Sequence, residues 1–453
     1  MKNRWSTPSE WFGRTESGRP ASQLAVLDYV WGREEFTATD VMEGTGLTRA
    51  TAIDALGRLA DAGLVLELAN VRQAGEEKGG ADNRSGGGAT RSGGARVYRK
   101  GRPARRFAFR PQAGVVVGVD AGYTRLSAIA ADLAGTTLAS VSALSGWEPD
   151  TGARPVEALA EGEADKRREA VRSLVSKVLR AAGRTERELF AVCVGVPAPV
   201  NESGDSPSHH AGFWEKVNPG LLEALSDLAP IVRIENDALL AAVAEGTVGA
   251  AQGCASYVAV LGGARMGAGV VIDGKLLRGA HGAVGEMNAF EHVAGVGDSR
   301  GFAEYAGLLG ANLVAAGEAP RGGEAVVDGT VGPAPGGAFD GLSPEEVTGR
   351  LVFEAIEAGD PDALVIAAHV GERLARIVTV LESFYDPERI VVSGAVGPAM
   401  IRVIEAARAA MPHAFESIVP ELVGSELGAE AVVVGAVSAA VEMARSRALD
   451  IAG

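Results

Sequence analysis

The sequence contains few cysteines and few aromatic residues, and it has no long apolar runs. Only two cysteines, Cys193 and Cys254, occur among 453 residues, too few for a disulfide scaffold or a zinc cluster. No stretch of 18 apolar residues occurs, so we expect no membrane partner. The first residues, MKNRWSTPSEWFGR, hold no apolar segment typical of a secretory signal, and we therefore expect a cytoplasmic protein.

The charge is unevenly distributed along the chain. The formal net charge is −15, yet residues 1–110 carry 18 Lys and Arg against 13 Asp and Glu. A basic amino-terminal region on an acidic body is typical of a nucleic-acid-binding module joined to another domain. A solvated basic linker explains the same pattern. The length predicts two to four domains, and 47% hydrophobic residues exclude a wholly disordered chain.

Residues 20–71 predict three helices. PASQLAVLDYVWG has apolar residues at helical spacing, and residues 37–40 have the form of a capping box that would start a short second helix. Thr48 is suited to cap the third helix, and Gly63 is suited to end it. The apolar residues expected on one face of this third helix are Leu47, Ile53, Leu56 and Leu59.

The second and third predicted helices are joined by a short glycine-containing turn, as in a helix-turn-helix. In such a unit the last helix enters the major groove by its first residues. Arginine makes bidentate contacts to guanine, and threonine contacts a phosphate or a thymine methyl group. The candidate DNA-binding residues are Thr48, Arg49, Ala50, Thr51 and Arg58. A three-helix bundle with a polar outer face fits the same pattern.

Two predicted strands follow, LVLELANV and the segment RVYRKGRPARRFAFR, and they would complete a winged helix. The glycine-rich stretch between them has no periodicity and predicts a flexible insertion. Residues 72–110 carry 11 Lys and Arg against 3 acids. Arg102, in the sequence KGRP, is suited to enter a narrow minor groove. Alternatively, this segment only adds non-specific attraction to phosphates.

In the acidic body, predicted buried strands end in polar residues. One strand ends at Asp120, followed by Gly122 and Thr124, which offer a close backbone approach and a hydroxyl. Another strand runs into Asn236 and Asp237 at the start of an alanine-rich helix. Ligands bind at such carboxyl ends of strands in α/β proteins. Asp237 is suited to act as a general base toward a hydroxyl, or as a plain helix cap.

The most specific pattern is GAHGAVGE at residues 279–286. Small residues around a histidine, ending in a glutamate, predict a backbone packed tightly against a ligand. Residues 317–341 have no periodicity and predict a loop.

These motifs resemble the ROK family of repressors, uncharacterised proteins and sugar kinases. GLTRATAIDALGRLADAGLV followed by GRPARRFAF is similar to the amino-terminal part of its regulators, and GAHGAVGE is close to a family signature. The resemblance covers residues 20–440, apart from the glycine-rich insertion and residues 315–341. It implies an α/β chain, with a winged helix-turn-helix domain followed by an actin-like (ribonuclease H-like), two-lobed domain of the sugar-kinase type. The implied boundaries are 20–71 for the winged helix-turn-helix, 72–110 for wing and linker, 111–238 for the first lobe, and 239–453 for the second lobe with a terminal helix returning to the first.

The resemblance also implies a sugar site. Kinases of the family bind a hexose with an Asn-Asp pair, whose Asp is the catalytic base, and with two glutamates. The matching positions here are Asn236, Asp237, Glu286 and Glu304. The sugar-binding set is therefore expected to be intact.

Other family positions differ. The histidine that binds sugar and zinc is replaced by Ala289, and the three zinc cysteines fall at Gly295, Gly297 and Phe302. None of these residues can bind zinc, and we expect no metal. The remaining histidines, His281, His292 and the pair His209-His210, are expected to be ordinary polar residues.

The nucleotide loops also differ. Tyr123 stands where the family has a second glycine in the first loop, and Arg265 occupies a glycine position of the second. Arg265 would block a phosphate cradle, or its charge would attract an anion. The remnants of both loops are expected at Asp120, Gly122, Thr124, Gly267 and Gly269.

The sequence thus predicts a transcriptional regulator of the repressor type, located with the nucleoid, which binds a double-stranded DNA operator and a sugar effector as a homodimer or homotetramer. No cofactor is expected, and the kinase activity is expected to be lost. The alternative is an ATP- and Mg²⁺-dependent sugar kinase, with Asp237 as its catalytic base and an appended DNA-binding head. A regulator whose sugar site binds nothing is a third possibility.

Overall fold

The computed structural model describes residues 20–69, 104–123, 125–144, 163–208, 212–263, 265–318, 332–411 and 419–452. The glycine-rich insertion, Arg102, Thr124 and the pair His209-His210 lie outside these residues. The chain divides into two compact units. One comprises Thr15–Gly114, Asp132–Ala134 and Arg445–Gly453, and the other, the body, comprises Val115–Ala131 and Gly135–Ala444. Within the described ranges, no helix is long and apolar enough to cross a membrane.

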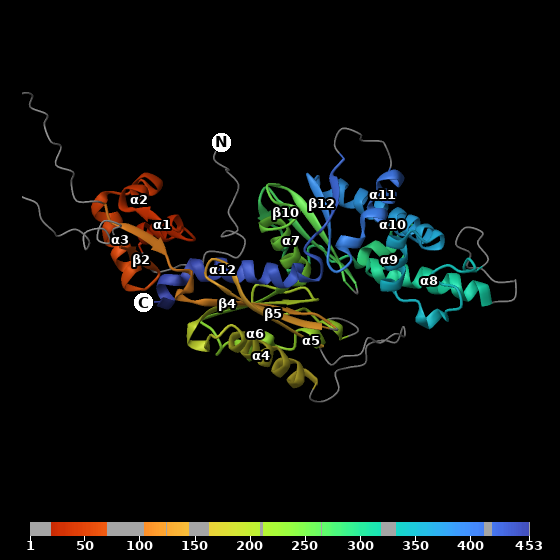
Figure 1. Ribbon diagram of the computed structural model, residues 1–453, viewed down its shortest axis with the longest axis horizontal. Coiled ribbons are helices and arrows are strands. Elements are labelled where there is room, and N and C mark those ends of the chain that lie inside the picture. Colours follow the sequence, from red (N-terminus) through yellow and green to blue (C-terminus); the bar gives the residue numbers. More distant parts are fainter. Residues whose placement is uncertain are drawn as a thin grey trace, which may run out of the picture. The chain divides into compact units, whose positions relative to one another are not determined.

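The amino-terminal unit contains three helices and a small sheet (Figure 1). The helices are α1 (Ala21–Val30), α2 (Ala38–Thr45) and α3 (Arg49–Asp61). The strands β1 (Phe36–Thr37), β2 (Val65–Leu68) and β3 (Arg106–Phe109) lie in the order β1-β3-β2, and both pairs are antiparallel. Two strands therefore follow α3 in this unit, which is the arrangement of a winged helix-turn-helix.

Local hydrogen bonds set the helix ends in this unit. Thr37 and Asp40 form the predicted capping box, in which the Thr37 backbone N–H donates to Asp40 Oδ2 at 2.7 Å. These bonds from Thr37 lower the pKa of Asp40. Gly46 adopts a left-handed conformation with φ of 71° and ends α2, and Thr48 then caps α3.

The predicted apolar face of α3 is wrong at two residues, because Leu47 precedes the N-cap Thr48 and lies outside the helix, and Ile53 is exposed. Ile53 is 50% exposed, whereas the buried residues of this helix are Ala52, Ala55, Leu56 and Leu59. These four residues follow the spacing i, i+3, i+4 and i+7 of a single helix face. Ile53 lies one position outside that face and points away from the core.

The body contains two five-stranded sheets (Figure 1). The first has the order β6-β5-β4-β7-β8 and the second the order β11-β10-β9-β12-β13. By position in the chain, both sheets therefore have the order 3-2-1-4-5. The strands of the first sheet are β4 (Val115–Ala121), β5 (Arg125–Asp132), β6 (Thr137–Leu144), β7 (Leu189–Val196) and β8 (Ile231–Asn236). Those of the second are β9 (Tyr257–Gly262), β10 (Met266–Ile272), β11 (Lys275–Leu276), β12 (Arg389–Ser393) and β13 (Glu421–Gly424).

Each sheet has three parallel strands at one side and an antiparallel hairpin at the other. β4, β7 and β8 are parallel in the first sheet, as are β9, β12 and β13 in the second. β5 pairs with β6, and β10 with both β9 and β11, in antiparallel fashion. This repeated order gives the body its actin-like, two-lobed architecture. The strands β7 and β9 are buried at every residue, as expected for strands covered on both faces.

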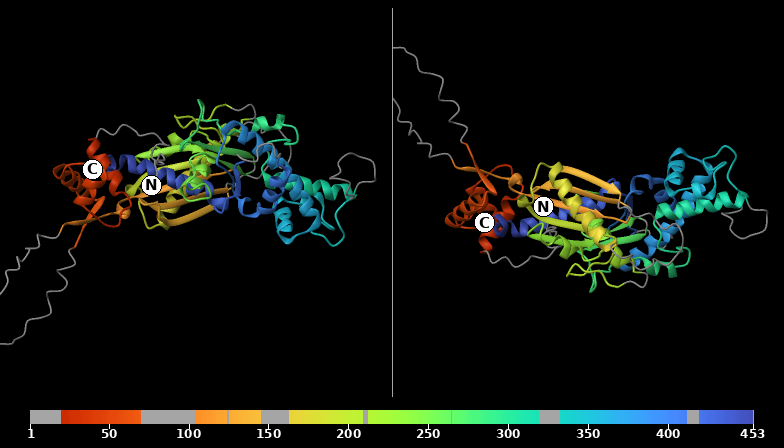
Figure 2. Two further views of the ribbon diagram at one scale, coloured as in Figure 1. Left: turned by 90° about the horizontal axis from the view of Figure 1, so that it is seen from above. Right: turned by 90° about the horizontal axis from the view of Figure 1, so that it is seen from below.

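Helices cover the sheets. In the first lobe these are α4 (Glu163–Ala181), α5 (Phe213–Val217) and α6 (Leu221–Leu225), with α4 lying over the outer face of the first sheet (Figure 2). In the second lobe they are α8 (Phe302–Glu318), α9 (Gly349–Ala358), α10 (Pro361–Tyr385) and α11 (Ile401–Ala410). The predicted loop at 317–341 thus begins within the last turn of α8. Short 3-10 turns occur at η2 (Pro111–Ala113), η3 (Glu186–Glu188), η4 (Asn288–His292), η5 (Pro344–Glu346), η6 (Gly397–Ala399) and η8 (Gly428–Glu430).

Two further helices pack between the sheets. α7 (Asp237–Thr247) lies on β9 and β10, and the body part of α12 (Ala431–Ala452) lies on the first sheet (Figure 1). Glycines allow these contacts, because a Cβ at Gly435 of α12 would lie 1.9 Å from the Leu240 carbonyl oxygen of α7. The layers of the body are therefore first sheet, α12, α7 and second sheet.

Candidate ligand site and nucleic-acid interface

The candidate ligand residues of the first lobe meet at one edge of its sheet. Because β4, β7 and β8 are parallel, their carboxyl ends lie at the same edge. Asp120 is the penultimate residue of β4, and Asp237 follows β8 directly as the first residue of α7. This edge is the usual ligand position in open α/β sheets.

Asn236 and Asp237 have different local roles. Asn236 is the N-cap of α7, since its Oδ1 accepts from the Leu239 backbone N–H at 3.0 Å. Its Nδ2 donates to the Ala198 carbonyl at 3.0 Å, which fixes the loop that follows β7. Asp237 is not the cap, and its Oδ1 accepts from the Ala238 backbone N–H at 2.7 Å. Asn236 therefore shapes the site, and Asp237 has a carboxyl oxygen to offer a ligand.

The two aspartates are unusually poor acids. Burial, together with the nearby charges of Asp120 and Glu286, raises the pKa of Asp237 to about 8. Burial likewise raises the pKa of Asp120 to about 7, against the lowering effects of Arg167 and Arg125. The structure thus brings Asp120, Asp237 and Glu286 within electrostatic reach of one another, and such clusters are typical of functional sites.

Residues 279–286 are packed tightly, although their neighbour is the protein itself. A Cβ at Gly282 would lie 1.9 Å from the Val200 carbonyl oxygen, and one at Gly285 would lie 1.7 Å from the Ala268 carbonyl oxygen. Both glycines have positive φ, of 70° and 87°. The tight packing of this backbone is confirmed against the protein itself, and its contact with a ligand stays a prediction. The glycines bring this segment onto β10 and onto the loop after β7, and the segment thereby links the two lobes.

Glu286 and Glu304 lie at the two ends of the segment that connects residues 279–286 to α8. Glu286 follows the glycines and forms an isolated bridge with Gly267 of β10, whereas Glu304 lies exposed in the first turn of α8. Desolvation raises the pKa of both carboxyls, and the charge of Arg265 lowers it in both. The charge of Arg265 therefore acts on the carboxyl groups of both glutamates.

A buried arginine holds the first loop. Arg167 of α4 is 5% exposed and donates to the carbonyls of Ala121, Gly122 and Val217. Its charge also lowers the pKa of Asp120. Tyr123, in the same loop, packs against Phe213 with ring centroids 5.6 Å apart. Pattern reasoning did not single out Arg167, because nothing in the sequence around it distinguishes it from the other arginines of an amphipathic helix.

The expected remnants of the second phosphate loop lie in a strand. Gly267 and Gly269 belong to β10 and face α7, where a Cβ at Gly269 would lie 2.4 Å from the Ala242 Cβ. Arg265 precedes this strand and donates to Asn288 Oδ1 at 2.8 Å and to Ser299 Oγ at 2.6 Å. These glycines therefore pack against the protein's own helix.

The positions that the resemblance assigns to zinc do not fit a metal ion. A Cβ at Gly295 would lie 2.5 Å from Arg376 Nε, and Phe302 is fully buried in the core of the second lobe. Ala289 and Gly297 supply no ligand atom. Within the described ranges, no three His, Cys, Asp or Glu side chains gather into a group that could hold a metal. His292 has a side chain that is 83% exposed, and His281 is exposed as well.

The amino-terminal unit presents a polar face on α3. Thr48, Arg49 and Ala50 are exposed, and Thr48 Oγ1 lies 2.9 Å from Thr51 Oγ1. Arg58 is also exposed and pairs with Asp54 at 3.1 Å. The exposed Ile53 lies between these groups on the same helix. It was missed as a residue of this face because its spacing in the sequence assigned it to the core. Its apolar side chain is suited to contact a thymine methyl group.

Known proteins match this architecture. The sequence profile of the ROK family matches residues 116–442. The fold resembles the crystal structure of a ROK family transcriptional regulator, a homologue of the E. coli MLC protein, with a TM-score of 0.63, 17% identity, and coverage of 95% of this chain and 98% of that chain. At this identity the likeness is one of fold.

Sugar kinases match a smaller share of the chain. A ROK family glucokinase from Streptomyces griseus, in complex with glucose and AMPPNP, has 23% identity and a TM-score of 0.49, and covers 72% of this chain and 98% of its own. A ROK hexokinase from Thermus thermophilus has 26% identity and a TM-score of 0.45, with 72% and 97% covered. No protein of curated function matches the sequence.

Proposed function

The chain belongs to the ROK family, and we propose that it is a DNA-binding transcriptional regulator of the repressor type that senses a sugar or sugar derivative. One observation carries this proposal. A winged helix-turn-helix unit with an exposed polar recognition face stands in the same chain as a ROK body. Kinase activity requires no such unit. The location that follows is the cytoplasm, on the nucleoid.

The exposed face of α3 supports DNA as the partner. The Arg49 side chain makes no hydrogen bond or ion pair within the described ranges, so its guanidinium is available for a guanine. Thr48 and Thr51 are suited to contact phosphates at the helix start. Paired half-sites, read by a homodimer or homotetramer, are the usual target of such units.

The carboxyl groups of the body support a hydroxyl-rich ligand. Asp237, Glu286 and Glu304 offer acceptor oxygens, and an unpaired buried hydroxyl of a ligand would cost about 1–3 kcal/mol. Lobe movement on binding would change operator affinity only if the ligand prefers one of the two forms.

The second phosphate loop supports the loss of kinase activity. Arg265 stands at a glycine position and bonds Asn288 and Ser299, while Gly267 and Gly269 pack on α7. A phosphate cradle needs free backbone N–H groups and glycines open to the ligand. No cofactor is part of this proposal.

Genomic footprinting with the purified chain tests the DNA-binding role and supplies the operator. We expect Arg49→Ala to weaken operator binding by about 1–3 kcal/mol, with a smaller effect on random DNA. Lys216→Ala, a substitution in the body, is the control and should leave both affinities unchanged. An equal loss on both DNAs would assign Arg49 to a phosphate. No enrichment of any sequence would overturn the proposal.

Titration of the operator complex with a panel of hexoses and amino sugars tests the sensor. We expect one of them to change operator affinity, and Glu286→Ala to remove that response while sparing DNA binding without sugar. If no sugar changes operator affinity or thermal stability, the body binds nothing in its ligand site. The protein is then a regulator without an effector.

An ATP-dependent sugar kinase with a DNA-binding head is the second candidate. The observation in its favour is Asp237, whose raised pKa of about 8 suits a general base near neutral pH. An ADP-release assay over the same sugars separates the two functions. Turnover that Asp237→Asn abolishes would overturn our proposal.

A further inference from the structure

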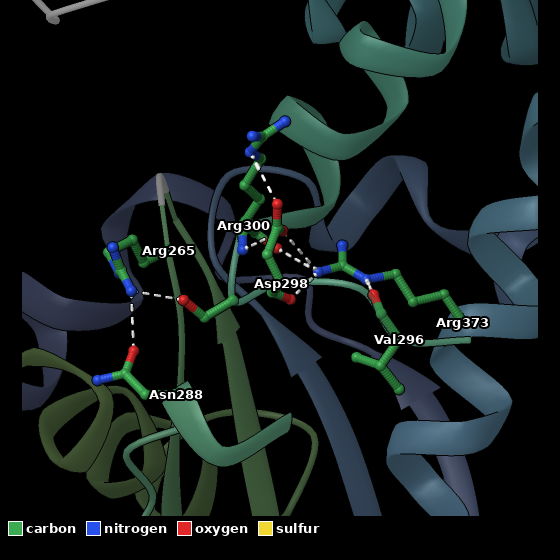
Figure 3. Close-up of polar contacts among 7 residues, drawn as sticks. Arg265, Asn288, Val296, Asp298, Arg300 and Arg373 are labelled. Atoms are coloured by element: carbon green, nitrogen blue, oxygen red, sulfur yellow. Dashed lines mark hydrogen bonds and ion pairs between the residues drawn. The ribbon is translucent and has the colours of Figure 1, made fainter. Parts of the chain in front are cut away.

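One loop of the second lobe is organised around a single arginine. The loop comprises residues 296–300, between η4 and α8, and the arginine is Arg373 of α10 (Figure 3). Arg373 Nε donates to the Val296 carbonyl at 2.8 Å. Its Nη2 donates to the carbonyls of Asp298 at 2.6 Å and Arg300 at 3.0 Å. Three alternate carbonyls of the loop therefore converge on one guanidinium.

The surroundings of Arg373 show that this contact is part of the core. Its side chain is 1% exposed and lies over the Tyr305 ring, 4.2 Å from the centroid. Asp298 Oδ1 lies 3.6 Å from Nη2, and Asp298 also pairs with Arg300 at 3.0 Å. A buried cation is costly unless it is paired and hydrogen-bonded, and here the loop supplies both the carbonyls and the carboxylate.

The same loop is held from a second side. Arg265, just before β10, bonds Ser299 Oγ at 2.6 Å and Asn288 Oδ1 at 2.8 Å (Figure 3). The Met266 backbone N–H donates to the Ser299 carbonyl at 2.8 Å. Two separate elements of the lobe, α10 and β10, thus hold the 296–300 loop in place.

The position of the loop in the chain connects it to the ligand residues. Glu286 precedes η4, and Glu304 lies in the first turn of α8, directly after the loop. The carbonyl of Gly301 accepts from the Tyr305 backbone N–H at 3.0 Å and so begins α8. A change in the loop would therefore move the start of α8 and Glu304 with it.

We propose that Arg373 is a positioning residue that organises the 296–300 loop without a metal ion and thereby places the acceptor oxygens of Glu304. A planar guanidinium with several directed N–H groups can bind three carbonyls at once. The metal-binding positions implied by the family resemblance are occupied here by Gly295, Gly297 and Phe302, whose side chains cannot bind a metal ion. The part of the inference that concerns Glu304 rests on the proposed sugar-sensing function.

Hydrogen exchange of the full chain, measured without sugar, tests the loop anchor. We expect Arg373→Lys and Arg373→Met to accelerate exchange in peptides spanning 293–305 by about tenfold or more. Lysine keeps the charge but cannot span three carbonyls. Arg350→Lys, at an exposed arginine of α9 paired with Glu354, is the matched control and should change nothing there. Unchanged exchange in both Arg373 variants would overturn the proposal.

Chemical rescue separates positioning from a general loss of stability. In Arg373→Ala, guanidinium chloride at about 20 mM should restore protection of 293–305, because the free ion can bind the same carbonyls. Urea and sodium chloride at equal concentration should not. At this concentration guanidinium is too dilute to change the stability of the fold in general, so a variant that is merely unstable would regain no protection, and that result would count against the proposal.

The zinc content of the purified protein tests whether the loop is organised without a metal ion. We expect well under one zinc per chain by inductively coupled plasma mass spectrometry, and no change in exchange of the loop after EDTA. One zinc per chain, with loop protection lost on chelation, would overturn the proposal. D-glucose and N-acetyl-D-glucosamine are then used as thermal-shift probes. If neither binds but the loop results hold, the sugar-sensing function fails while the anchor stands.

Discussion

The two lobes share one strand order, and each holds a loop with a buried arginine from a covering helix. In the first lobe Arg167 of α4 donates to the carbonyls of Ala121, Gly122 and Val217. In the second lobe Arg373 of α10 donates to three carbonyls of the 296–300 loop. Both side chains are almost fully buried, at 5% and 1% exposure. In each lobe, a buried arginine on a covering helix thus binds the backbone carbonyls of a loop.

The carboxylate beside each arginine differs, and this difference separates their roles. Asp120, near Arg167, is buried enough that its pKa rises to about 7 despite the arginine. Asp298, near Arg373, has a side chain that is 41% exposed and pairs with a second arginine, Arg300. Arg167 therefore lowers the pKa of Asp120, a candidate ligand residue, whereas Arg373 mainly fixes the backbone of its loop. Equal topology does not give the two loops equal chemistry.

The largest expected effect comes from removing the first arginine. Arg167→Met should lower the free energy of unfolding of the body by about 3–5 kcal/mol, because three carbonyls and Asp120 lose their cation. Arg373→Met should cost less, about 2–3 kcal/mol, since Asp298 keeps Arg300. Urea denaturation at pH 7, followed by circular dichroism, measures both. Arg180→Met, at the exposed end of α4, is the control and should cost under about 0.5 kcal/mol.

Equal losses of free energy of unfolding in Arg167→Met and Arg373→Met would contradict the comparison. They would show that the ion pair between Asp298 and Arg300 does not reduce the cost of removing Arg373. A larger loss for Arg373→Met would reverse the assignment of roles.

A second prediction concerns the helix layers between the sheets. A Cβ at Gly118 of β4 would lie 2.5 Å from the Val437 backbone nitrogen of α12, and one at Gly269 of β10 would lie 2.5 Å from the Ala238 carbonyl oxygen of α7. Gly118→Ala and Gly269→Ala should each cost about 1–3 kcal/mol in thermal denaturation. Gly57→Ala, in open space on α3, should instead add about 0.5–1 kcal/mol. A negligible loss of stability for only one of the two variants would show that the helix packed on that sheet can shift to accommodate the added methyl group.

Much of this fold could be predicted from the sequence because the elements are locally encoded. The capping box at Thr37 and Asp40, the glycine after α2 and the continuous apolar run of β4 each depend on near neighbours. Ile53 was misplaced because apolar spacing alone does not say which of two adjacent helix faces meets the core. That choice depends on how α3 packs on α1 and α2, which is a tertiary property.

The candidate site divides in the same way. Asp120, Asn236 and Asp237 could be predicted because they lie at the ends of strands, and a strand end is a local signal. The roles of Gly282 and Gly285 could not, because the carbonyls they approach belong to residues 200 and 268, distant in the chain. Arg167 and Arg373 were missed for the same reason. Each looks like one arginine among many until the loop carbonyls around it are known.

Asp237 predicts a gain of stability that depends on pH. Burial and the charges of Asp120 and Glu286 raise the pKa of Asp237 to about 8, so the folded protein holds this proton more tightly than the unfolded chain. Stability should therefore fall as pH rises from about 4 to about 8. Asp237→Asn removes this penalty, and at about 1.4 kcal/mol per pKa unit we expect a gain of about 1–2 kcal/mol at pH 5 that grows to about 4–5 kcal/mol at pH 8.

Urea denaturation at both pH values measures this gain, with Glu357→Gln on the exposed side of α9 as a control that should be neutral at each. Asp298→Asn is the matched variant in the second lobe. It removes an ion pair with Arg300, so it should destabilise the protein at pH 5 and at pH 8 alike. A gain from Asp237→Asn that is equal at both pH values would mean that the proton is not its cause. The contrast between a charge-tuned first lobe and a shape-fixed second lobe would then lose its basis.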